Sequence, residues 1–122
     1  MATEQANVAI SLPVAADYSA KQYYIVGVNS SGQAVLAGEG SDAIGVLQDA
    51  PAAAGRPGKI VVSGGTKVIC GGSITKGARF SVDSNGKASA VGSSDDYALG
   101  WVLETGASGS IVSAVFQPIG KS

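Results

Sequence analysis

The sequence contains no histidine and a single cysteine, Cys70. Without histidine, the common Ser-His-Asp and Cys-His forms of nucleophilic catalysis are excluded. Zinc sites are built mainly from clustered cysteine and histidine, so their usual pattern is excluded as well. Cys70 cannot form a disulfide within the chain, and its apolar neighbours predict a small buried side chain. We expect no cofactor and no bound metal.

Charge is also scarce. Charged residues make up 14% of the 122 residues, and the formal net charge is −1 at pH 7. Such a chain has no basic field to attract nucleic acid. No apolar run approaches the roughly 20 residues that a membrane-spanning helix needs, and the acidic N-terminal segment is unlike a secretory signal. We expect synthesis in a cytoplasm and no binding to nucleic acid or membrane.

The remaining motifs for catalysis or metal binding are weak. Asp95 and Asp96 form an adjacent carboxylate pair. Neighbouring residues on a strand point to opposite faces, so this pair indicates a solvated turn rather than a glycosidase site. Residues 83–86 (Asp-Ser-Asn-Gly) begin like a calcium loop but lack its later ligands. We therefore predict that the protein is not an enzyme.

Glycine and β-branched residues dominate what is present. The 18 glycines separate short runs rich in valine and isoleucine, which is typical of an all-β domain. We predict a small barrel or sandwich of about ten short strands. Two of these strands are expected at residues 59–62 and 66–70, joined by a turn, and another begins at Tyr23. Residues 20–122 are expected to form one β domain, preceded by an N-terminal arm over residues 1–19.

The chain also carries an internal repeat. Residues 28–38 align with residues 82–92 and are identical to them at five positions, and an Ala-apolar-Gly triplet recurs at 43–45 and 98–100. After a loop, a Gly-x-Ile-Val segment follows at 58–61 and again at 109–112. The shared order of hairpin, break, triplet, loop and Gly-x-Ile-Val predicts two pseudo-symmetric halves built from one β unit.

The N-terminal segment has strand periodicity. Its apolar residues alternate with small or polar ones; they are Val8, Ile10, Leu12 and Val14. Pro13 has no amide hydrogen to donate to a central ladder, so the segment is predicted to be an edge strand or an extended arm.

Trp101 is the single tryptophan and lies on a predicted strand. Two interpretations stay open at this point. The indole is either part of the core or an aromatic anchor at an interface with another protein.

The order of these segments resembles that of the small capsid decoration proteins of tailed bacteriophages, also called cement or head-stabilising proteins. The resemblance covers residues 20–118. It is carried by Ala-Ile-Gly-Val-Leu at 43–47 with the Ala/Pro/Gly-rich loop that follows, and by the segments 58–65, 74–78 and 98–103.

The resemblance implies a structural virion protein on the outer surface of an expanded phage capsid. Such proteins commonly form homotrimers and stabilise contacts between subunits of the major capsid protein. Their N-terminal arms often add a strand to a capsid protein sheet. Here the arm would be residues 3–14, with Val8, Ile10, Leu12 and Val14 as candidate anchors, and its acceptor would be the major capsid protein or a neighbouring copy.

Two alternatives remain beside this hypothesis. The chain also suits another structural virion component, such as a head fibre base, a tail subunit or an adhesin subunit. A β-sandwich module for carbohydrate is the other alternative, in which Trp101 and the four tyrosines would stack on sugar rings.

Overall fold

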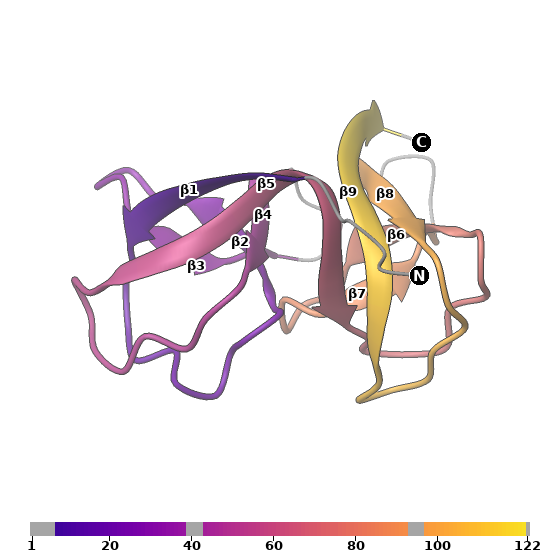
Figure 1. Ribbon diagram of the computed structural model, residues 1–122, viewed down its shortest axis with the longest axis horizontal. Helices are drawn as coiled ribbons and strands as arrows, with labels where there is room; N and C mark the ends of the chain where they lie inside the picture. The colour runs from indigo at the N-terminus through magenta and orange to yellow at the C-terminus, as the bar shows by residue number, and fades with distance from the viewer. Residues whose placement is uncertain (1–6, 39–42, 93–96, 122) are drawn as a thin grey trace, which may run out of the picture.

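The computed structural model describes residues 7–38, 43–92 and 97–121. Within these ranges the chain is all-β, as predicted, and contains no helix and hence none that could span a membrane. Nine antiparallel strands form one strongly curled half-barrel (Figure 1). They are β1 (Asn7–Pro13), β2 (Ile25–Val28), β3 (Ala34–Leu36), β4 (Gly45–Leu47), β5 (Pro57–Ile69), β6 (Arg79–Val82), β7 (Ala88–Ala90), β8 (Tyr97–Val102) and β9 (Ile111–Lys121).

The strand order is mirrored about the β5–β9 pair when β2, β3, β4 and β5 are matched with β6, β7, β8 and β9. It runs β3-β2-β4-β5-β9-β8-β6-β7, with β1 added alongside β5. Each side of the β5–β9 pair therefore repeats the same hairpin and the same two following strands. Figure 1 shows the two lobes that result, which we call the N half (residues 7–63) and the C half (residues 65–121). The predicted pseudo-symmetry is confirmed.

Strand β5 joins the two halves without a break (Figure 1). The turn expected at residues 63–65 was wrong, because β5 continues through them for 13 residues. Its first part pairs with β1 and its last part with β9, and Gly64 is opposite both Asn7 and Phe116. Gly64 has a φ of 101°, a conformation that glycine adopts without strain. The glycine pair thus marks a change of ladder partner within one strand.

The two halves repeat the side-chain hydrogen bonds of one turn as well as their strand order. The side chain of Asn29 accepts hydrogen bonds from the backbone N–H groups of residues 31 and 33. Asp83, its equivalent in the C half, does the same for residues 85 and 87. Gly32 and Gly86 close these turns with φ values of 77° and 80°. Asparagine and aspartate make such turns because a short side-chain oxygen reaches the backbone two residues on.

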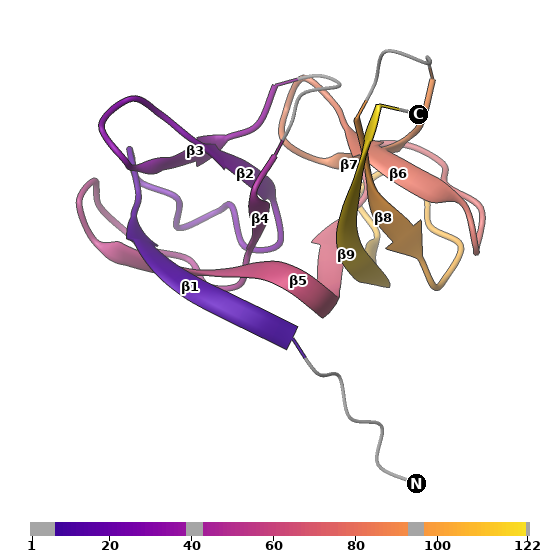
Figure 2. The same ribbon diagram turned by 90° about the horizontal axis from the view of Figure 1, so that it is seen from above.

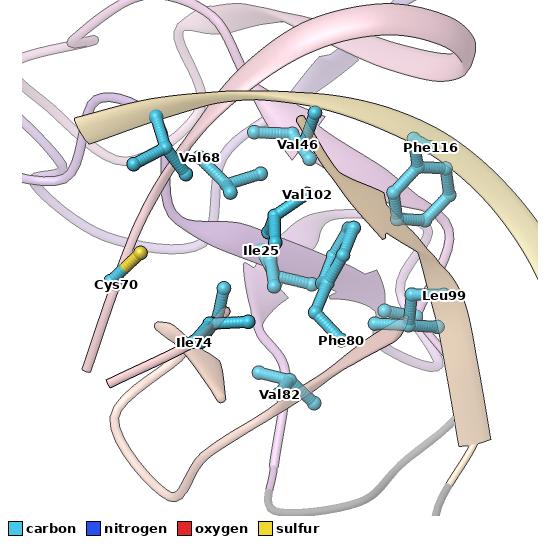
Figure 3. Packing of buried hydrophobic residues seen from close by; sticks show 14 of the residues in the cluster. Ile25, Val46, Val68, Cys70, Ile74, Phe80, Val82, Leu99, Val102 and Phe116 are labelled. Carbon is cyan, nitrogen blue, oxygen red and sulfur yellow. The ribbon is translucent and has the colours of Figure 1, made fainter. Parts of the chain in front are cut away.

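The buried side chains form two clusters. The smaller one fills the N half and contains Val14, Tyr18, Val26, Ala34, Leu47 and Ile60. The residues at the same ladder and loop positions of the C half all belong to the larger cluster; they are, in the same order, Cys70, Ile74, Phe80, Ala88, Val102 and Ala114. Figure 3 shows the larger cluster from close by. Each half therefore buries the same positions on one face of its strands, which we call the inner face; the opposite face is the outer face.

Candidate functional site

Strand β1 presents the most accessible apolar side chains of the predicted arm. Val8 is 58% exposed and Ile10 is 40% exposed. Within the described ranges β1 pairs only with β5, and it lies along the outside of that strand (Figure 2). Its other edge therefore offers backbone N–H and C=O groups to an added strand. Of the two alternatives expected from the sequence, an edge strand or an extended arm, residues 7–13 adopt the edge strand.

The other two predicted anchors belong to the domain itself. Leu12 is half-buried against the N-half cluster, and Val14 is fully buried within it. The backbone N–H of Val14 donates to the carbonyl oxygen of Arg56 at 2.9 Å. A partner can therefore reach Val8 and Ile10 without changing the fold, whereas contact with Val14 would require this part of the sheet to open.

Trp101 lies on the outer face of β8. It is half-buried, while the next residue, Val102, points inward and is fully buried. The register places Trp101 opposite Arg79 on β6 and opposite Val115 on β9, and Val115 is in turn opposite Gly65 on β5. Gly65 adds no side chain to this row, and its carbonyl oxygen accepts a hydrogen bond from the side-chain amide of Asn7 at 3.1 Å.

Two of the four tyrosines are buried and do not offer their rings to a sugar. Tyr18 and Tyr24 are each 8% exposed. The hydroxyl of Tyr18 accepts a hydrogen bond from the backbone N–H of Leu36 at 3.3 Å, and the ammonium of Lys21 lies 4.8 Å from the centre of the Tyr24 ring. Two of the four tyrosines therefore serve the packing of the N half.

The described residues contain no cluster of three or more histidine, cysteine or acidic side chains that could hold a metal. Asp95 and Asp96 lie outside the described residues. Cys70 is fully buried, and this burial raises the pKa of its thiol. A raised pKa lowers the fraction of thiolate, which is the reactive form.

Comparisons with known proteins identify the fold. No protein-family model matches the chain, and no curated protein matches it in sequence. Among solved structures, the chain is similar to the head fiber gp8.5 N base of bacteriophage phi29. The TM-score is 0.70 at 15% sequence identity, and the match covers 90% of this chain and 93% of the other. At this low sequence identity, the structural likeness establishes a common fold and nothing further.

Proposed function

We propose that this protein is a structural component of a phage head that attaches to the outer surface of the capsid as the base of a head fibre. The observation that carries the proposal is the fold shared with the phi29 head fiber base over nearly the whole of both chains. This likeness supports the head fibre base, which was an alternative at the sequence level, better than it supports a capsid decoration protein.

The major capsid protein is the proposed partner, and β1 is the proposed point of attachment. A capsid strand that adds to the free edge of β1 would gain affinity from backbone hydrogen bonds, and pockets for alternate side chains would give specificity. Val8 and Ile10 are alternate residues of the strand, so they share one face of β1 and would enter such pockets together. Stabilisation of contacts between capsid subunits and assembly as a homotrimer belong to the same proposal.

Co-sedimentation with phage heads that lack this protein tests the proposal. Saturable binding to expanded heads is expected, and unexpanded heads from the same source serve as the comparison. Binding to expanded heads alone would support the additional stabilising role. Failure to bind either form would overturn the proposal of a capsid-attached base.

A double variant, Val8→Glu with Ile10→Glu, tests the attachment strand. Full burial of such a side chain is worth about 1.5–3 kcal/mol. Val8 and Ile10 are roughly half exposed, so their burial by a partner is worth about 1 kcal/mol each. Loss of the contributions of both side chains predicts roughly a 30-fold weaker affinity for heads. Ile111→Glu is the matched control, because Ile111 is 51% exposed on β9. Equal affinities of the double variant and the control would remove β1 from the mechanism.

A further inference from the structure

Equivalent outer positions of the two halves differ in burial. In the N half, Ile25, Val46 and Val61 form a row across β2, β4 and β5, and each is at most 1% exposed. The ladder registers match these three with positions of the C half that we call the outer row; they are Arg79, Trp101 and Val115. The alignment of residues 58–61 with 109–112 expected from the sequence was wrong, because Val61 takes the ladder position of Val115. Arg79 is exposed and the other two are half-buried.

The cause of this difference is the packing between the halves. Ile25 and Val46 belong to the larger cluster, which otherwise consists mainly of inner residues of the C half. Figure 3 shows both of them among Phe80, Val102 and their neighbours. The inner surface of the C half thus covers the outer face of the N half, whereas no described residue of the chain covers the outer row in the same way.

The inner surfaces show the converse difference. Four inner residues of the C half are at most 1% exposed, while their equivalents in the N half are only partly buried or, for Val28, 46% exposed. The pairs are Val68 with Leu12, Val82 with Val28, Leu99 with Ile44, and Phe116 with Val62. We call the four residues of the N half the open inner surface.

We propose that the outer row of one copy packs on the open inner surface of a second copy, and so repeats between chains the contact that joins the halves within a chain. The occupant is a second copy because the chain itself shows that an outer face of this unit fits an inner surface of the same unit. Trp101 would be the anchor, since a partly exposed tryptophan loses a large apolar area when a partner covers it.

The proposed contact is heterologous, because it joins two different surfaces. A heterologous contact produces a closed ring when its rotation closes, and a filament otherwise. The homotrimer of the proposed function would be one such ring. The contact is tested without any capsid, so its failure and a failure of capsid attachment are separate results.

Self-association of three proteins tests the proposal: the unaltered chain, Trp101→Glu and Val28→Glu. Sedimentation at increasing concentration should show oligomers of the unaltered chain, with at least a tenfold weaker association for each variant. Trp101→Glu keeps the open inner surface and Val28→Glu keeps the outer row. An equimolar mixture of the two should therefore form 1:1 dimers that grow no further, because one intact contact remains.

Three further measurements make the result decisive. Ser108→Glu adds the same charge to the exposed turn before β9 and should associate like the unaltered chain. Thermal unfolding should show that every variant is folded. The fluorescence of Trp101, the single tryptophan, should shift to shorter wavelength as the unaltered chain associates. A monomeric unaltered chain, or variants that associate as it does, would overturn the proposal, as would a mixture that forms no dimer.

Discussion

Substitution of Gly100 by alanine should destabilise the protein far more than an ordinary glycine-to-alanine change. A methyl group at this position would collide with the carbonyl oxygen of Val115 and lie 2.9 Å from its carbonyl carbon. Gly100 also has a φ of 151°, a region almost confined to glycine. Overpacking costs about 1–3 kcal/mol and backbone strain about 1–3 kcal/mol. A less flexible unfolded chain offsets about 0.4–1 kcal/mol, which leaves a net loss of about 3 kcal/mol.

Gly45 is the equivalent position in the N half and separates the two contributions. A methyl group there would collide with the carbonyl oxygen of Val61 and lie 2.6 Å from Cγ2 of Ile60, but Gly45 is not among the glycines of positive φ. Gly45→Ala should therefore cost about 1–2 kcal/mol. Gly27→Ala is the control, because no heavy atom lies within 4 Å of the added methyl group. It should be neutral or stabilise by up to about 1 kcal/mol.

Urea unfolding followed by circular dichroism measures all three variants. With a slope of about 1.5 kcal/mol per M, a loss of about 3 kcal/mol lowers the midpoint by about 2 M. An unfolding free energy of Gly100→Ala within about 0.5 kcal/mol of that of Gly27→Ala would refute the close contact, because that margin is typical of harmless surface changes. A Gly45→Ala variant that proved the most damaging of the three would refute the role of backbone strain at Gly100.

Two further predictions concern side-chain chemistry. Cys70 is fully buried with a raised pKa, so a thiol reagent should label the folded protein slowly and the urea-unfolded protein fast, and fast labelling of the folded protein would contradict this packing. The backbone N–H of Ser113 donates to the Glu104 carboxylate at 2.8 Å, and this bond, with the nearby Lys67 charge, lowers the pKa of Glu104. A carboxyl group whose pKa is lowered by folding stabilises the protein above its pKa in the unfolded chain, which is about 4. This stability is lost as the pH falls through the lower pKa of the folded protein. Unfolding free energies at pH 3 and pH 6 should therefore differ less in Glu104→Gln than in the unaltered protein.

Features that depend on neighbouring residues were predictable from the sequence. The turns at 29–32 and 83–86 depend on an asparagine or aspartate with a glycine three residues later, a pattern that can be read directly from the chain. The structure places hairpins at both. The strand expected from Tyr23 begins instead at Ile25, because Tyr23 has a φ of 69°. The equivalent residue of the C half is Gly77, with a φ of 86°. Glycine at the equivalent position therefore indicates a positive φ, which a tyrosine at this position does not indicate.

Features that depend on distant partners were not predictable in the same way. A glycine pair between two apolar runs normally indicates a hairpin. Gly64 and Gly65 instead lie within β5, because β1 holds one part of this strand and β9 holds the other. Both partners are remote from the glycine pair in the sequence, so no local pattern distinguishes this arrangement from a turn. The accessible part of β1 depends in the same way on where β5 lies.

The burial of a strand face depends on what packs against it, and β4 and β8 show the difference. Residues 44–47 of the N half read Ile-Gly-Val-Leu, a continuous apolar run typical of a strand that is covered on both faces. Residues 99–102 read Leu-Gly-Trp-Val, and their outer side chain is a large aromatic with a polar ring nitrogen. A tryptophan suits a surface that is exposed to water in the free chain and covered by a partner in a complex, because its ring is apolar and its N–H can donate a hydrogen bond. The divergence between Val46 and Trp101 therefore follows from their positions: one faces the other half of the chain, and the other faces outward.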